Sequence, residues 1–162
     1  MDDNSCNCDT CCSACTYKPG WFAPGEVAKA ALFLDMTSQE FFNTYLAVDW
    51  YETSKNADAI FILAPAITKI SPGGMYPANP KGQCVFYKEN KCSIHPAKPS
   101  ECRNYSHDDS HEDTEKYHKI IANEWKNNQQ EILDLYPHPR VEEPDMVDMF
   151  DLLFDIGNFR FL

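Results

Sequence analysis

The chain has 162 residues, which fits one core, so we expect a single domain over residues 1–162. Its 25 acidic and 14 basic residues give a formal charge of −11, which repels a phosphate backbone and excludes nucleic acid as an expected partner. No apolar run reaches the roughly 20 residues of a membrane-spanning helix, and residues 1–5 do not resemble a signal peptide, so we expect a cytoplasmic protein without a membrane partner.

The first part of the chain predicts two helices after an irregular start. Residues 1–20 are polar and cysteine-rich, and we expect little regular structure there. Pro24 precedes a helical stretch over residues 27–34, at a position that a helix start tolerates. Thr37-Ser38-Gln39-Glu40 is a capping-box pattern, and the apolar spacing after it predicts a second helix to about Asp49.

Strand and turn signals dominate the middle of the chain. The apolar run 59–63 predicts a buried strand, and a loop rich in glycine and proline follows over residues 71–80. Residues 84–87 and 91–94 flank a turn-like tripeptide, which predicts a β-hairpin. A short helix is expected to carry Ser100 to Arg103.

The last third of the chain predicts helices. After the acidic stretch 104–115, an apolar stripe from Tyr117 to Tyr136 predicts one long helix that Pro137 ends. A further helical element is expected over residues 144–156. The predicted fold class is therefore α+β, mainly α: a single small domain of several helices with a short β-hairpin and a cysteine-rich metal site.

Eight cysteines form two groups in the sequence, and none is scattered through the other predicted helices. In a reducing cytosol such clusters indicate metal binding rather than disulfides. Two C-x-x-C pairs occur in the first group, a spacing shared by zinc ribbons and ferredoxins. The candidate ligands are Cys6, Cys8, Cys11, Cys12, Cys15, Cys84, Cys92 and Cys102. For Cys6 and Cys15 we also consider the alternative that the side chain does not bind the metal.

The second group carries a resemblance to a known family. Its sequence reads Cys92-Ser93-Ile94-His95-Pro96-Ala97-Lys98-Pro99-Ser100-Glu101-Cys102-Arg103, preceded by Cys84 in an apolar stretch. This resembles the YkgJ-like cysteine-cluster family, the CxxCxxCC domain that chelates zinc or iron. The first group departs from the family pattern, because Cys6-x-Cys8-x-x-Cys11-Cys12 is one residue short at its first spacing. Lys98 also stands where the family usually has arginine.

The resemblance covers residues 6–108 as a metal-binding region and leaves residues 109–162 as a C-terminal helical extension. It implies metal binding, and the family's usual label is that of an iron–sulfur oxidoreductase. Thiolates alone do not choose between the metals. The all-cysteine set and the adjacent pair Cys11-Cys12 favour one or more iron–sulfur clusters, of the 4Fe-4S type, over zinc.

Three functions remain open at this stage. An iron–sulfur centre would serve electron transfer to a redox partner protein, or catalysis on a small-molecule substrate if an iron lacks one cysteine ligand. A zinc-bound chain would be a structural or protein-interaction module. Metal storage or delivery is the third function. The sequence predicts no catalytic residue and no oligomeric state.

Several other residues could assist the metal centre. Arg103 is a candidate for hydrogen bonds to sulfur or for orienting an anionic substrate, with a surface ion pair as the alternative. His95 is a candidate neighbour of the centre, or a ligand in place of a cysteine. The stretch 107–113 is expected to be a solvated helix start rather than a metal site. Trp21, Phe22 and Tyr76 are expected to pack in the core.

Overall fold

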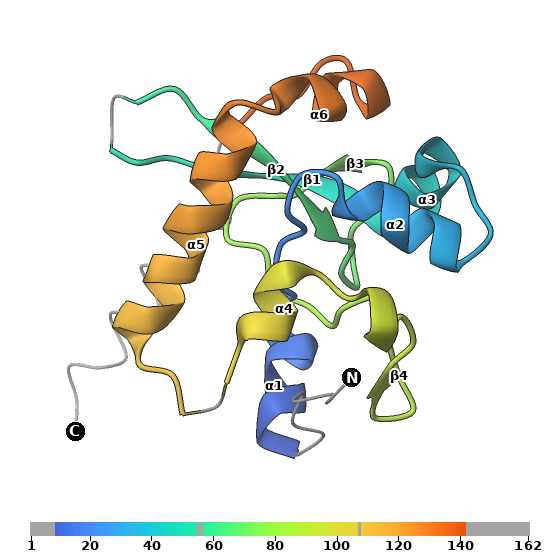
Figure 1. The fold of residues 1–162 in the computed structure, drawn as a ribbon, viewed down its shortest axis with the longest axis vertical. Coiled ribbons are helices and arrows are strands. Elements are labelled where there is room, and N and C mark those ends of the chain that lie inside the picture. Colours follow the sequence, from blue (N-terminus) through green and yellow to red (C-terminus); the bar gives the residue numbers. More distant parts are fainter. Residues whose placement is uncertain (1–8, 55–56, 107, 142–162) are drawn as a thin grey trace.

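The computed structural model describes residues 9–54, 57–106 and 108–141; along these residues three helices come first, five short strands follow, and helices return at the end (Figure 1). The described elements form the α+β fold that the sequence predicts. In chain order they are α1 (Asp9–Tyr17), α2 (Glu26–Phe33), α3 (Ser38–Tyr45), β1 (Leu46–Tyr51), β2 (Ile60–Pro65), β3 (Gly74–Met75), β4 (Tyr87–Lys88), β5 (Lys91–Cys92), the 3₁₀ turn η1 (His95–Ala97), α4 (Ser100–Asn104), α5 (His111–Lys126) and α6 (Gln129–Leu135).

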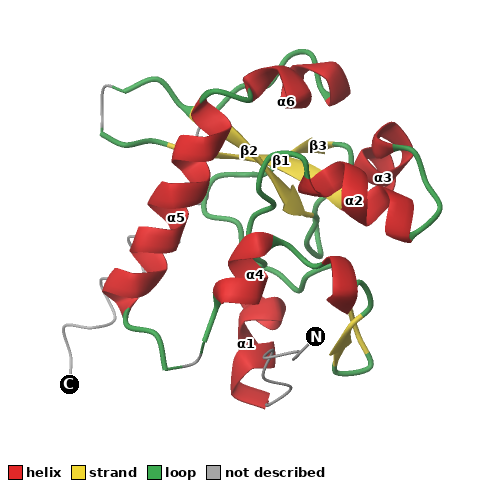
Figure 2. Ribbon diagram, viewed as in Figure 1, coloured by secondary structure: helices red, strands yellow, loops and turns green. Residues whose placement is uncertain are grey.

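A three-stranded mixed sheet lies among the helices, in the order β2-β1-β3 (Figure 2). β1 pairs antiparallel with β2, from Leu46 opposite Pro65 to Tyr51 opposite Ile60, and parallel with β3, where Ala47 lies opposite Gly74. β2 confirms the strand predicted over residues 59–63. The first four residues of β1 are all buried, so this part of the sheet is covered on both faces.

The second predicted helix is shorter than expected. Its capping box is present, because the Thr37 hydroxyl accepts from the Glu40 N–H and the Glu40 carboxylate accepts from the Thr37 N–H. However, α3 ends at Tyr45, and the prediction that it continues to Asp49 was wrong. Pairing with β2 and β3 satisfies the backbone of residues 46–51 and buries their apolar side chains, which outweighs a weak helical pattern.

The predicted long C-terminal helix is divided into two. α5 begins at His111 with a second capping box, formed by Ser110 and Asp113, and ends at Lys126. α6 begins after Asn128, whose amide donates to the Glu124 carbonyl at 2.7 Å. Asparagine side chains bond to nearby backbone more readily than they continue a helix, so Asn127 and Asn128 separate α5 from α6. The sequence prediction had placed both residues inside one helix.

The cysteine-bearing end of the chain has both confirmed and corrected elements. The hairpin is confirmed as β4–β5, with Tyr87 opposite Cys92. Its turn residues Glu89 and Asn90 both have positive φ, as a tight hairpin turn requires. The short helix is confirmed as α4. The expectation of little regular structure in residues 1–20 was wrong, because Asp9–Tyr17 is helical.

The core gathers side chains from the sheet, α2, α3 and α5. Trp21, Phe22 and Tyr76, predicted to pack in the core, are at most 3% exposed. The Trp125 indole N–H donates to the Phe22 carbonyl at 2.6 Å, which fixes α5 to the segment between α1 and α2. The segment that follows α1 is therefore held rigidly against the core.

Two predictions concern residues that the structure does not describe or only partly describes. The helix expected over residues 144–156 lies outside the described residues. The structure also does not test the division into a metal-binding region and an extension. Within the described ranges, no helix is long and apolar enough to cross a membrane.

Candidate metal centre

Four of the eight candidate cysteines have described side chains, and they come from four different parts of the chain. Cys15 lies near the end of α1, Cys84 precedes β4, Cys92 ends β5 and Cys102 lies in α4. The Cys84 N–H donates to the Cys15 carbonyl at 2.7 Å. A backbone hydrogen bond therefore joins the end of α1 directly to the residue that leads into the hairpin.

The thiols of these cysteines lie close enough to influence one another. The pKa of the Cys84 thiol is raised to about 12, chiefly by burial and to a smaller extent by the charges of Cys15 and Cys92. Burial also raises the pKa of the Cys102 thiol well above its usual range, with added effects from Cys84 and Cys15. The two cysteine groups of the sequence thus meet in space, and Cys84 is coupled to all three of the others.

Backbone N–H groups point at two of these sulfurs. The Cys84 sulfur accepts a hydrogen bond from the Phe86 N–H, and the Cys102 sulfur accepts one from the Gly20 N–H. The Tyr87 N–H donates to the Cys84 carbonyl at 3.0 Å. The donors to sulfur oppose the effect of burial, because they stabilise a thiolate. They are therefore already arranged for the deprotonated sulfurs that a metal requires.

The donor set fits a metal cation for a simple electrostatic reason. Ionised together, the four buried or half-buried thiolates would repel one another, and a cation among them would turn that repulsion into attraction. Soft sulfur ligands suit zinc and iron in iron–sulfur clusters. Among the described residues, however, no three Cys, His, Asp or Glu side chains are spaced as a ready-made metal site.

The remaining candidate ligands are not tested by the structure. Cys11 and Cys12 belong to α1, four and three residues before Cys15, but their side chains are not described. Cys6 and Cys8 lie outside the described residues. The prediction that all eight cysteines bind metal therefore stays a prediction.

Arg103 makes the ion pair that the sequence left as its alternative role. Its guanidinium donates to the Glu26 carboxylate and, at 2.8 Å, to the Ser100 hydroxyl. The Glu26 carboxylate also accepts from the Ser100 N–H at 2.9 Å. Burial alone would raise the pKa of Glu26, but the hydrogen bonds from Ser100, Ala23 and Arg103 outweigh burial and lower it. This network ties α4 to the start of α2.

His95 opens the 3₁₀ turn that follows the hairpin, and its Nε2 lies 3.2 Å from the Lys98 ammonium. The structure thus places it between the hairpin and α4, beside Cys92 in sequence.

In the stretch 107–113, Asp113 caps α5, which is the solvated helix start that we expected. His107 lies outside the described residues.

Sequence reasoning missed three residues close to the cysteines. Gly20 approaches Cys102 so closely that a Cβ there would lie 2.9 Å from the sulfur. Glu101 is 8% exposed, and its Oε1 lies 2.6 Å from Nδ1 of His118. A carboxylate directly before Cys102 and a histidine on the following helix were the available signals, but only the fold brings them together.

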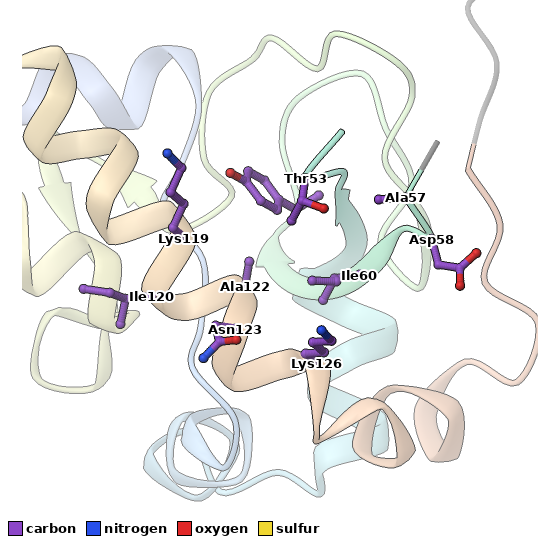
Figure 3. A pocket seen from close by; sticks show the side chains of 10 residues that line it. Thr53, Ala57, Asp58, Ile60, Lys119, Ile120, Ala122, Asn123 and Lys126 are labelled. Carbon is purple, nitrogen blue, oxygen red and sulfur yellow. The ribbon is translucent and has the colours of Figure 1, made fainter. Parts of the chain in front are cut away.

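A cavity of about 590 Å³ lies between α5 and the connection from β1 to β2 (Figure 3). Its lining includes Lys119, Asn123 and Lys126 from α5, and Thr53 and Asp58 from the connection between the two strands. No candidate cysteine lines this cavity, so it is separate from the candidate metal centre.

The fold and the gathered cysteines define a small cysteine-rich domain of the metal-chelating class. The chain belongs to the CxxCxxCC family, described as "Putative zinc- or iron-chelating domain", whose model matches residues 5–129. The match includes both cysteine groups and continues through α5. A search of curated proteins and a search of solved structures each found no match.

Proposed function

We propose that the cysteines hold an iron–sulfur centre of the 4Fe-4S type, and that the chain is a cytoplasmic redox protein. The observation that carries this proposal is the electrostatic coupling of Cys84 to Cys15, Cys92 and Cys102, with backbone N–H groups aimed at two of the sulfurs. Hydrogen bonds to sulfur and partial burial are the features by which proteins set the potential of such clusters.

The ligand composition supports iron–sulfur over zinc. Among the described residues, the groups that shift the pKa of Cys84 and Cys102 include other cysteines and no histidine, whereas many zinc sites combine cysteine with histidine. Eight cysteines provide four ligands for each of two clusters, which leaves no iron open and suits electron transfer to a partner protein. If one cysteine is spare, an open iron would suit a reaction on a small-molecule substrate.

One observation favours zinc as the second candidate. The elements that carry the cysteines are short: α4 has five residues, and β4 and β5 have two each. Such elements bury little apolar surface, and a structural zinc ion commonly stabilises them. Under this proposal the chain is a structural or interaction module, and removal of the metal unfolds its cysteine-bearing end.

The metal itself separates these proposals. The full chain is purified without oxygen, its visible spectrum is recorded, and iron, zinc and acid-labile sulfide are counted per chain. If the chain holds an iron–sulfur cluster, the protein is expected to be brown and to contain iron and sulfide in equal amounts. A colourless protein with one or two zinc ions and no sulfide would overturn the redox proposal and support the zinc module.

A further inference from the structure

The cavity between α5 and the connection from β1 to β2 presents apolar surface at some distance from any candidate ligand (Figure 3). Its volume is about 590 Å³, and none of the described cysteines lines it. Ile120 is 52% exposed although it lies in the middle of α5. Apolar surface of this kind is stabilised by an occupant that removes it from water. We call this feature the α5 groove and define it by Tyr51, Ile60, Lys119, Ile120, Ala122 and Lys126.

The α5 side of the groove is basic. Lys119 and Lys126 line it, and among the described residues no carboxylate lies within 4.0 Å of either ammonium group. Lys116 lies one helical turn before Lys119, so the three lysines follow one face of α5. Two described carboxylates lie at the groove: Asp58 in its lining, and Glu115, which accepts from the tyrosine hydroxyl of the groove at 3.2 Å. Three lysines against two carboxylates make this surface locally positive in a chain with a formal charge of −11.

The chain beyond Val141 has the complementary composition. Residues 142–162 lie outside the described part of the structure, and also beyond the family match, which ends at residue 129. Their sequence contains six Asp or Glu residues and one arginine, and about half of the residues are apolar. A segment with so much apolar surface is stabilised by a site that covers it, and its negative charge favours a basic site.

The aspartates of this segment recur at helical spacing. They are Asp145, Asp148, Asp151 and Asp155. Spacings of three, three and four residues place them on one face of the helix that the sequence predicts over residues 144–156. Val147, Phe150 and Phe154 fall on the adjoining face. From first to last the aspartates span about 15 Å of helix, which is also the length from Lys116 to Lys126.

The described chain brings this segment close to the groove. Gln129, at the start of α6, is bonded to the backbone of Phe61: its Oε1 accepts from the Phe61 N–H at 3.2 Å, and its Nε2 donates to the Phe61 carbonyl at 2.9 Å. Phe61 follows Ile60 of the groove. α6 itself is about 10 Å long, and residues 136–143 reach up to about 27 Å when extended. This connection is therefore long enough for residues 144–156 to return to the groove.

We propose that residues 144–156 dock as an amphipathic helix into the α5 groove of the same chain. The aspartates lie toward the lysines of α5, and the apolar face covers Tyr51, Ile60 and Ile120. The proposal goes beyond the metal centre and holds for either metal. It makes residues outside the family match part of the folded domain, and it gives the exposed Ile120 a partner.

Hydrogen exchange of the full chain, followed by mass spectrometry, tests the docking, and the metal content is counted in the same samples. We expect the amides of residues 144–156 to exchange at least about tenfold more slowly than in the denatured chain. The rate should be the same at about 1 and 100 μM chain, because the contact is within one molecule. Exchange as fast as in the denatured chain would overturn the proposal. Slowing that increases with chain concentration would overturn it in favour of a second copy as the occupant.

Charge reversal in the full chain tests the lysines. We expect Lys119→Glu combined with Lys126→Glu to speed the exchange of residues 144–156 about tenfold, because attraction becomes repulsion. Exchange of β1 and β2 should stay slow, which shows that the fold is intact. Lys29→Glu combined with Lys69→Glu makes the same change in net charge at exposed positions that do not line the groove, and should have no effect. Equal effects of the two pairs would overturn the role of the groove lysines.

Rescue and the apolar contact complete the test. Adding Asp148→Lys and Asp151→Lys to the reversed groove lysines should restore slow exchange, because the charges are again opposite. Ile120→Ser should speed the exchange about fivefold, whereas Leu32→Ser, at a position 77% exposed on α2, should not change it. Slow exchange of residues 144–156 that none of these variants changes would overturn the α5 groove as their site.

Discussion

The Gly20 N–H donates a hydrogen bond to the sulfur of Cys102, and a Cβ at position 20 would lie 2.9 Å from that sulfur. It would also lie 2.9 Å from Cβ of Glu101 and 3.0 Å from the Cys102 backbone nitrogen. The backbone between α1 and α2 and the helix that carries Cys102 therefore touch without a side chain between them. Only glycine permits this approach, because the obstacles include backbone.

The first prediction concerns this contact. Gly20→Ala must push α4 away, so we expect it to lower the free energy of unfolding by about 1–3 kcal/mol and to reduce the metal content per chain. Gly74→Ala is the control, because the nearest atom to its Cβ would be 3.7 Å away. Denaturant unfolding and metal analysis of both variants provide the measurement. If Gly20→Ala behaved like Gly74→Ala, the close approach would have no structural importance.

A second prediction tests the central cysteine. Cys84→Ser replaces a soft ligand with a hydroxyl that zinc and iron in clusters bind poorly, so we expect less than about half of the wild-type metal content. Ser93→Ala, at an exposed position next to Cys92, is the control and should keep the full content. Metal and sulfide per chain are measured on proteins purified in parallel. A fully loaded Cys84→Ser protein would remove Cys84 from the ligand set.

The third prediction follows from the network around Glu26. The pKa of Glu26 is lowered in the folded chain, so its contribution to stability is present above the unfolded pKa of about 4.3 and is lost as the pH falls through the lower folded pKa. We expect Glu26→Gln to cost about 1–2 kcal/mol near neutral pH, because Ser100 and Arg103 lose a charged partner.

Unfolding free energies of wild type and Glu26→Gln, measured from pH 7 to pH 3, check this prediction. The difference should be constant near neutral pH and shrink below about pH 4.3, where the wild-type carboxyl takes up its proton. Glu89→Gln, in the exposed hairpin turn, controls for a general loss of negative charge. A difference that grows on acidification would contradict the assigned direction.

The fourth prediction concerns the capping box of α3. Thr37→Ala removes the hydroxyl that accepts from the Glu40 N–H, and we expect a loss of about 1 kcal/mol in the free energy of unfolding. Thr44→Ala, near the exposed end of the same helix, should change it by less than about 0.5 kcal/mol. Thermal and denaturant unfolding give both values. Equal losses in the two variants would mean that the cap has no special role.

Several elements could be predicted from the sequence because they depend on residues that are neighbours in the chain. The capping box at Thr37, the hairpin around Glu89 and Asn90, and the short helix with Cys102 all depend on neighbouring residues, and the structure confirms each. Residues 46–51 were misread as helix because their partners, β2 and β3, lie elsewhere in the chain. Strand pairing is a tertiary contact, and a helical pattern in one segment cannot report it.

The sequence by itself determined the chemical class of the protein. Eight cysteines at these spacings identify a metal-chelating family, since soft ligands and their order along the chain define such domains. Only the tertiary structure decided which groups lie around the cysteines. Gly20 against Cys102, and Glu101 beside His118, are each separated by many residues and meet because the core fixes α1, α4 and α5 against one another. Spacing sets the ligand type, whereas burial and hydrogen bonds, which set the charge and reactivity of a site, arise from packing.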